Sequence, residues 1–501
     1  MKMRRNLIAG FLNSIWSAIV GLAAVPFYLK YLGIEAYGLI GFFVMAQAVL
    51  ALLDLGLSPT INREVARHSV SGDISESGGL LHSLAIVFWG MAGVIALGFF
   101  TLSSFVAEYW LQANSLPQDT VMKAVILMGI VIACRWPVGL YQGALIGAQR
   151  LAVYCGISAV MVTLGSLGAV AVLAFISPTI EAFFIWQACV GFLFAVTMRY
   201  AAWRVIGRIP GVRFDINSLK RIWRFSAGVG AVAVAAIILI QLDKVLLSRI
   251  LSLEDFGRYA LAGVVTSALY LLVNPVFNAI YPRLSALVAT GDTVKLIELY
   301  RMGTRAFCAA ILPFAVAGVF FSESLISVWT QNPELAASVA PIVSLLLIGT
   351  ALNGVMHFPY ALQLAYGVTR LPLLIAIILI VFMVPLIIVL SLTYGAVGGA
   401  AAWAVLNCVY LFLGTYLTHR LLLKGVGRKW LLIDVMAPLG VSLLIVGGGW
   451  LVQQLYDWQP IIRLLVGSGV GMFACAVIVM SSGRLRHLFL IQYGELRNRV
   501  L

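Results

Sequence analysis

Charged residues are scarce in this chain. Asp, Glu, Lys and Arg together make up only 10% of its 501 residues, whereas hydrophobic residues make up 62%. The mean hydropathy is correspondingly high, at +1.03. Apolar stretches separated by short connections account for almost the whole chain, so no segment remains that could form a soluble domain.

The sequence also lacks the patterns of several classes of site. Its six cysteines lie inside apolar stretches, without a Cys-x-x-Cys pair or a histidine at ligand spacing, so we expect small buried residues and no metal site. A Gly-x-x-x-x-Gly-Lys-Ser/Thr phosphate loop is missing, which excludes ATP hydrolysis by that route, and we predict no cofactor. No carboxylate or histidine cluster occupies a large connection, where a membrane glycosyltransferase would hold its sugar chemistry. We therefore do not expect an enzyme.

About fourteen apolar stretches follow one another, each close to the roughly 20 residues that cross a bilayer. The first is too long for a signal-peptide core and lacks a small-residue cleavage site, so we expect it to be retained. The sequence therefore predicts an all-α, polytopic membrane protein. The predicted spans are 7–29, 36–58, 78–106, 121–148, 151–176, 181–203, 226–248, 256–282, 300–321, 337–365, 371–392, 396–418, 431–453 and 460–481.

The basic residues, 33 against 19 acids, are sorted to one side of these spans. Every second connection is rich in Lys and Arg, and the connections between them carry mostly acids, such as Glu108 and Glu334. Basic connections face the cytoplasm in membrane proteins, so both termini are predicted to be cytoplasmic. This sorting explains the positive net charge by topology, and we expect no nucleic-acid partner. The basic connections are the N-terminus, 61–75, Arg150, 203–224, 283–305, Arg370, 419–429 and the tail from Arg484.

The chain contains a repeat. Placing Glu35-Ala36-Tyr37-Gly38 over Glu254-Asp255-Phe256-Gly257 gives an offset of 219 residues (257 minus 38), which also puts Gly72-Asp73 onto Gly291-Asp292. The first span falls on the seventh, an even number of crossings, so both copies have the same orientation. The two halves should be related by a pseudo-two-fold axis along the membrane normal, as in transporters whose halves rock around a midplane site.

The repeat divides the chain into two six-helix lobes and a C-terminal extension. We predict a first lobe at 1–203, a basic cytoplasmic linker at 204–225, a second lobe at 226–419, and the last two spans with a basic tail at 420–501.

Ionisable residues inside spans are rare and default to functional hypotheses. Arg135 lies near the middle of the fourth span, where its guanidinium could grip phosphate oxygens in bidentate fashion; a buried ion pair, with Asp243 for example, or snorkelling is the alternative. Arg305, one turn from Arg301 in the ninth span, and Lys123, at the outer start of the fourth, could extend this cationic surface. Cytoplasmic anchoring would also account for the arginines, and snorkelling for the lysine.

Three further residues could line a cleft or couple transport to an ion. Asp243 and Lys244 are adjacent in the seventh span and point about 100° apart, so they either serve different partners or fix the helix end as an interfacial charge pair. His357, deep in the tenth span, titrates in the physiological range and could carry a coupling proton; a hydrogen bond to a neighbouring helix is the alternative.

Six short motifs recur in a known family of membrane proteins. They are Leu29-Lys30-Tyr31-Leu32-Gly33, Glu35-Ala36-Tyr37-Gly38, Leu53-Asp54-Leu55-Gly56-Leu57, Arg63-Glu64-Val65-Ala66, Leu242-Asp243-Lys244-Val245-Leu246-Leu247 and Phe256-Gly257-Arg258-Tyr259-Ala260. With them the chain resembles the polysaccharide transport proteins, the Wzx-like O-antigen flippases of the multidrug/oligosaccharidyl-lipid/polysaccharide (MOP) flippase superfamily. The resemblance covers the twelve-helix core and implies a fold like that of the multidrug exporters (MATE) and lipid II flippases (MurJ).

The resemblance implies that an undecaprenyl-pyrophosphate-linked glycan is moved across a bacterial cytoplasmic (inner) membrane for surface polysaccharide synthesis. The diphosphate of such a cargo would suit Arg135, Arg305, Lys123 and Lys244, and membrane lipids would surround its tail. A polysaccharide polymerase and a chain-length regulator would be partners, and H⁺ or Na⁺ would be the coupling ion, through Asp243 or His357. Two alternatives stay open: an antiporter for cationic drugs in the same superfamily, and a non-transporting scaffold of a glycan-assembly complex.

Overall fold

The computed structural model describes residues 2–71, 76–207 and 240–483, with the single residues Phe214, Ser226, Ile238 and Arg486. Within these ranges the chain is helical apart from short turns and loops and one isolated parallel bridge between Gln112 and Ser252, so the predicted all-α class is confirmed. Contacts divide the chain into two compact units, Met1–Gly257 and Arg258–Leu501.

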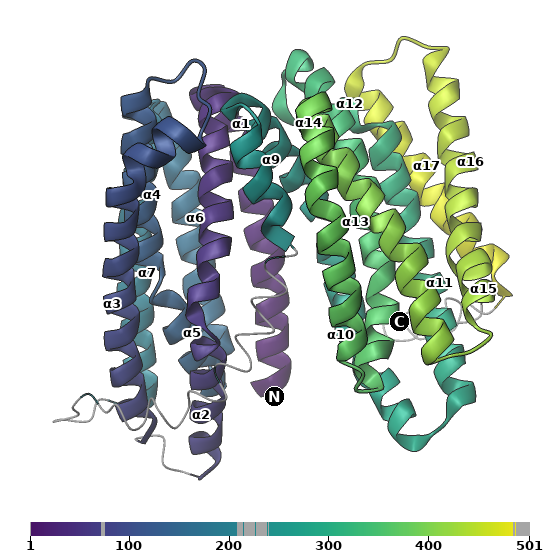
Figure 1. Cartoon of the computed structure of the whole chain (residues 1–501), viewed down its shortest axis with the longest axis horizontal. Helices are drawn as coiled ribbons and strands as arrows, with labels where there is room; N and C mark the ends of the chain where they lie inside the picture. Colours follow the sequence, from purple (N-terminus) through teal and green to yellow (C-terminus); the bar gives the residue numbers. More distant parts are fainter. Residues whose placement is uncertain are drawn as a thin grey trace, which may run out of the picture. The chain divides into compact units, whose positions relative to one another are not determined.

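The first unit is a bundle whose long helices run alongside one another (Figure 1). Ile61, Leu84, Tyr141 and Met198, from four different helices, are buried in one apolar cluster that packs these helices together. Its elements are α1 (Lys2–Leu50), η1 (Ala51–Asp54), α2 (Leu57–Ser71), α3 (Glu76–Phe105), the π-helix η2 (Val106–Trp110), α4 (Gln118–Arg135), α5 (Val138–Gly147), α6 (Leu151–Phe175), α7 (Ile180–Ile206), helical residues 240–250, and the start of α9 (Leu253–Ser267).

The second unit is also a helical bundle. Its last two long helices, α16 (Ala437–Gln454) and α17 (Pro460–Ser481), pack on one another and on α11 (Thr293–Phe320). The buried Phe321, Val446 and Ala474 lie in the apolar cluster between them. The elements after α9 are α10 (Tyr270–Thr290), α11 (Thr293–Phe320), α12 (Ser322–Thr330), α13 (Pro333–Ala365), α14 (Arg370–Leu421), α15 (Gly427–Lys429), the π-helix η3 (Trp430–Met436), α16 (Ala437–Gln454) and α17 (Pro460–Ser481).

Eleven helical stretches of the described chain are long and apolar enough to cross a membrane. Two of them contain two crossings each, because α1 turns at Gly33 (φ 80°) and α14 turns at Gly395 (φ 58°). Glycine adopts positive φ without steric penalty, so these residues allow the chain to reverse where other residues would be strained. Thirteen of the fourteen predicted spans are thereby matched, and the remaining one, 226–248, lies largely outside the described residues.

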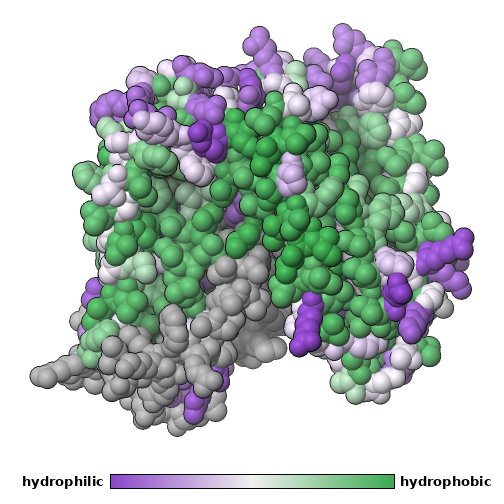
Figure 2. Space-filling model, viewed as in Figure 1, coloured by the Kyte–Doolittle hydropathy of each residue, from purple (hydrophilic) through white to green (hydrophobic). Residues whose placement is uncertain are grey.

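The surface of each unit agrees with this membrane assignment. Large apolar side chains such as Phe100, Phe175 and Leu444 are 61%, 88% and 79% exposed, respectively, on the sides of their helices. Figure 2 shows apolar side chains covering the long sides of the helices, with hydrophilic ones gathered near their ends. Such a surface fits a lipid environment, because in water this extensive apolar area would be exposed to solvent. The chain is a multi-pass membrane protein.

The repeat has a structural counterpart within the first unit. A Cβ on Gly38 would overlap the carbonyl oxygen of Leu253, and a Cβ on Gly257 would overlap that of Ile34. Ile34 and Gly38 correspond to Leu253 and Gly257 under the same offset, so each copy contributes one glycine and one carbonyl to a reciprocal contact. Such reciprocity is the signature of a local two-fold relationship.

Some predictions fall on residues that the structure does not describe. These include Gly72-Asp73 of the repeat, most of the linker 204–225 and the tail from Arg484. The contact-based division at Gly257 lies beyond the predicted linker because residues 248–253 are bound to the 110–112 segment of the first unit. The lobe boundaries remain predictions.

Candidate functional site

A pocket of about 480 Å³ lies within the first unit, next to Arg135. Its volume falls in the range of small-ligand sites. Apolar walls come from residues such as Phe88, Ile132 and Trp136. The polar lining residues are Gln47 of α1, Asp54 of η1, Ser58 and Asn62 of α2, Arg135 of α4 and Gln142 of α5.

The local sequence explains why Arg135 reaches this pocket. Pro137 has no amide hydrogen and therefore leaves out one bond of the helical hydrogen-bond ladder. The assigned helix α4 ends at Arg135 and α5 begins at Val138, although Trp136 between them keeps helical dihedral angles. Arg135 is the last residue of α4, where the ladder is interrupted.

The Arg135 guanidinium is held from one side. Its Nη2 donates a hydrogen bond to Oε1 of Gln187 at 2.5 Å, and Nε2 of Gln187 donates to the Gly165 carbonyl at 3.0 Å. Gln187 is only 7% exposed, so its amide cannot turn without breaking both bonds. The guanidinium carbon also lies 5.8 Å from the centroid of the Phe43 ring, within the range of a cation–π contact.

No carboxylate pairs with Arg135 among the residues that the structure describes. The alternative of a buried pair with Asp243 is therefore not realised there; Asp243 lies 3.3 Å from the Nζ of Lys244 instead. A guanidinium has five N–H donors, and only one is used by a side chain here. The remaining donors suit an anionic oxygen ligand.

The same pocket contains one acid. The Asp54 carboxylate accepts hydrogen bonds from the backbone amide of Ser58 at 3.2 Å and from its hydroxyl at 2.9 Å. These bonds tie Asp54 to the first turn of α2. Asp54 and Arg135 thus line one pocket while making separate protein contacts.

The other predicted cations lie elsewhere. Lys123 is exposed and pairs with Asp119 at 2.5 Å, one turn away. Twelve residues of α4 separate Lys123 from Arg135, which corresponds to about 18 Å along the helix axis. Lys244 donates to the Ile240 carbonyl at 3.1 Å as well as to Asp243. Neither lysine lines the pocket of Arg135.

Arg305 belongs to a buried ionic cluster in the second unit. Its Nη2 lies 2.5 Å from Oδ1 of Asp434, and Nε of Arg301 lies 2.7 Å from Oδ2 of the same carboxylate. Asp434 is fully buried in η3, and the neighbouring Trp430 donates to Thr304 at 2.8 Å. These bonds fasten η3 to α11. Asp434 escaped the sequence analysis, although it is the one acid within the predicted span 431–453 and could have been found on that ground.

His357 lies on α13 of the second unit, one turn after Asn353. Its Nδ1 lies 3.0 Å from the Asn353 carbonyl, and its ring meets that of Phe277 edge-on at 5.7 Å. The Asn353 side chain accepts from Tyr270 at 3.2 Å and donates to Asn407 at 3.0 Å. Asn353 lies one turn earlier in α13, so this hydrogen bond stays within the helix of His357 and is not the bond to a neighbouring helix given as the alternative. The coupling role stays a prediction.

Several amides of the Arg135 site were not singled out from the sequence. Gln47, Asn62 and Gln142 line the pocket, and Gln187 supports the guanidinium. Three of them could have been recognised as candidates from the sequence, because Gln47, Gln142 and Gln187 are uncharged polar residues inside predicted spans. Polar groups in that environment require partners or ligands.

The fold has clear relatives among solved structures. The lipid II flippase MurJ in its inward closed conformation matches with a TM-score of 0.67, at 15% identity, over 95% of this chain and 99% of that one. An inward-facing multidrug resistance MATE family transporter of the MOP superfamily matches with a TM-score of 0.64, at 14% identity, over 81% and 95%. A mutant of the Vibrio cholerae MATE transporter VcmN gives 0.55, at 14% identity, over 85% and 99%.

These identities establish the shared fold alone, which confirms the predicted MATE- and MurJ-like architecture. All three proteins are named as flippases or transporters. A comparison with curated proteins gave no significant match. The family model described as "Polysaccharide biosynthesis protein" matches residues 3–288, more than half of the chain. The chain belongs to the polysaccharide biosynthesis protein family.

Proposed function

We propose that this transporter moves a polyprenyl-pyrophosphate-linked oligosaccharide across the bacterial cytoplasmic membrane by alternating access. The cargo would serve the synthesis of a surface polysaccharide such as O-antigen, exopolysaccharide or capsule. The family supports a role in polysaccharide biosynthesis, and one structural neighbour is a lipid II flippase. The polyprenyl tail would stay in lipid while the head group enters the protein.

The observation that carries this proposal is the Arg135 guanidinium, which lines a pocket in the middle of a span and pairs with no described carboxylate. An arginine in that environment is retained only where it serves a ligand or a water-filled path. Two unit charges 4 Å apart attract by about 4 kcal/mol at an effective dielectric constant of 20. A diphosphate carries the charge and the paired oxygens that a guanidinium binds best.

The remaining charged residues take supporting roles in this proposal. Lys123 and Lys244, each beside an acid, would attract the head group along its path but not grip it. Arg305 would act with Arg301 to hold the C-terminal helices. Coupling to H⁺ or Na⁺ would use Asp243 or His357. The basic connections would face the cytoplasm with both termini, and a polymerase and a chain-length regulator would be partners.

Deleting the gene tests the proposal. Lipid-linked oligosaccharide should accumulate on the cytoplasmic leaflet while surface polysaccharide is lost, and a wild-type copy should restore export. Normal surface glycan in a strain without a redundant flippase would contradict the proposal.

A second function is favoured by Asp54, the acid in the same pocket. An antiporter for cationic drugs would bind its cargo at a carboxylate, so Asp54→Asn would abolish efflux of a cationic dye. Under the flippase proposal the deletion strain retains normal dye resistance. The two measurements therefore separate the alternatives.

A further inference from the structure

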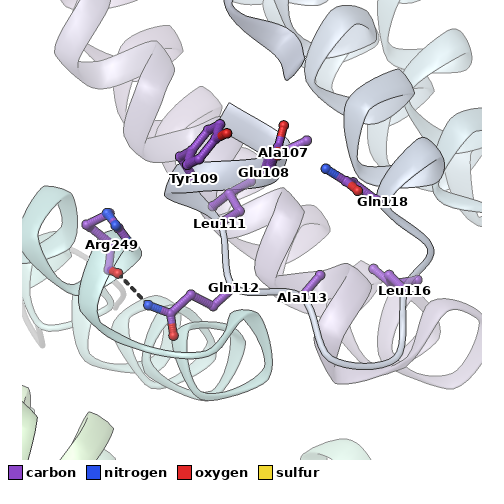
Figure 3. Close-up of a pocket in the computed structure, with 9 residues that line it drawn as sticks. All are labelled: Ala107, Glu108, Tyr109, Leu111, Gln112, Ala113, Leu116, Gln118 and Arg249. Carbon is purple, nitrogen blue, oxygen red and sulfur yellow. Dashed lines mark hydrogen bonds between the residues drawn. The ribbon is translucent and has the colours of Figure 1, made fainter. Parts of the chain in front are cut away.

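A second pocket, of about 430 Å³, lies at the opposite end of α4 from Arg135. It is formed by η2, the loop 111–117, Gln118 at the start of α4, and Arg249. Figure 3 shows Glu108 and Gln118 reaching toward the gap between η2 and α4, with Gln112 and Arg249 on the other side of the loop. This pocket shares no lining residue with the site described above.

The walls of this pocket are held in place. The buried Glu35 carboxylate accepts hydrogen bonds from the amides of Asn114, at 2.5 Å, and Ser115, at 3.1 Å, and from the Ser115 hydroxyl. On the other side, the Gln112 carbonyl accepts from the amide of Leu253 at 2.7 Å, and its side chain donates to the Arg249 carbonyl at 3.0 Å. A loop bound on both sides is preorganised, so a ligand would not have to order it.

The π-helix η2 contributes Ala107, Glu108 and Tyr109 to the lining of the pocket. It ends where the Leu111 amide donates to the Val106 carbonyl at 2.9 Å, and π-helical turns of this kind occur frequently at functional sites. Tyr109 is 57% exposed, and its ring stacks on that of Phe105 with centroids 5.7 Å apart. One face of the Tyr109 ring is thereby supported, which holds the ring in a set orientation.

The chemistry of the lining selects a class of ligand. Glu108 and Arg249 contribute opposite charges, so the pocket has no net charge to offer an anion or a cation. The amides of Gln112 and Gln118 both donate and accept hydrogen bonds, and Tyr109 adds an aromatic ring with a hydroxyl. Mixed donors and acceptors beside an aromatic ring match a neutral ligand with several hydroxyl groups and an apolar ring face.

We propose that this pocket is a subsite for an uncharged sugar ring. Glu108 and Gln118 would bind its hydroxyl groups, and Tyr109 would pack against it. The positive-inside pattern puts Glu108 and Asp119 on the outer side of the membrane, so the ring would be a sugar of the glycan after translocation. This last assignment rests on the proposed function, whereas binding of a neutral sugar does not.

Saturation-transfer NMR on the full chain in lipid nanodiscs tests the subsite. The probes are methyl α-glucopyranoside, N-acetylglucosamine and rhamnose as neutral sugars, with glucuronic acid and glucosamine as charged comparators. We expect a signal from at least one neutral sugar, and at least fivefold weaker signals from the charged ones. The Glu108→Ala and Gln118→Ala variants should lower the neutral signal at least fivefold.

The matched control is Glu181→Ala, which removes the same charge at the N-terminal turn of α7, outside the pocket. Its sugar signal should equal that of the wild type, as should that of Arg135→Ala. No signal from any neutral sugar, or equal signals from wild type and the Glu108 and Gln118 variants, would overturn the subsite. Normal export without sugar binding refutes the subsite alone, whereas sugar binding together with normal surface glycan in the deletion strain refutes the flippase alone.

Discussion

Gln187 fixes the orientation of Arg135. Its amide oxygen accepts from the guanidinium at 2.5 Å while its amide nitrogen is bound to the Gly165 carbonyl at 3.0 Å, so the acceptor side always faces the arginine. A neutral partner leaves the full positive charge available to a ligand. A carboxylate at the same place would neutralise it.

Replacing Gln187 by Glu should therefore lower glycan export about tenfold or more, since hydrogen bonds to charged groups contribute roughly 1.5–3 kcal/mol. Gln187→Ala should lower export less, because it frees the guanidinium without neutralising it. Surface glycan is measured against the amount of protein in the membrane. Wild-type export by the Glu variant would show that the charge of Arg135 is not used.

Arg135→Ala should abolish export without lowering the amount of protein in the membrane, and Arg135→Lys should recover part of it. A lysine keeps the charge but loses the bidentate geometry. Lys295→Ala is the control, because it removes an exposed cation that pairs with Asp292 and has no role in the proposal, and it should leave export close to wild type. Full export by the Arg135→Ala variant would make Arg135 a structural residue.

Asp434→Asn should destabilise the second unit. The change leaves the guanidinium groups of Arg301 and Arg305 without their shared carboxylate, and breaking a buried ion pair from one side costs about 3 kcal/mol or more. Thermal unfolding in detergent should show a clearly lower midpoint. Asp457→Asn is the control, since the exposed Asp457 lies 3.4 Å from Arg463 and such surface pairs contribute at most about 1 kcal/mol. Equal midpoints for the two variants would contradict the anchoring role of Asp434.

Gly38→Ala and Gly257→Ala should each lower the unfolding midpoint, because the added methyl group meets a backbone carbonyl that has little room to move. Overpacking of this kind costs typically 1–3 kcal/mol. The control is Gly263→Ala in α9, where a Cβ meets no atom within 4 Å and the helix gains about 0.5–1 kcal/mol. A neutral effect at both contact glycines would show that the reciprocal contact is loose.

The predicted membrane spans were largely correct, because each depends only on residues that are close together in the sequence. Span 371–392 and span 396–418, for example, appear in the structure as the two halves of α14, with Gly395 between them. A run of about 20 apolar residues has to cross the bilayer wherever it lies, so a short window of sequence contains the information. The repeat was accessible for the same reason, since Glu35-Ala36-Tyr37-Gly38 and its copy can be compared directly.

The predicted site residues lie in different surroundings in the structure. Arg135 does line a pocket, but the amides around it and the partner of Arg305 were missed. Hydropathy ranks a residue by its own chemistry, whereas the role of a buried charge depends on what lies opposite to it. Arg135 and Arg305 look alike in sequence, yet one meets a neutral glutamine and the other a carboxylate.

The sequence by itself determined the all-α class, thirteen of the membrane spans and the sorting of basic residues, because each of these follows from residues close together in the chain. The tertiary structure alone decided which charges are neutralised. Asp434 lies 129 residues from Arg305, and Gln187 lies 52 residues from Arg135. The free energy of a buried charge depends on such distant partners, and only the packing of the helices brings them within hydrogen-bond distance.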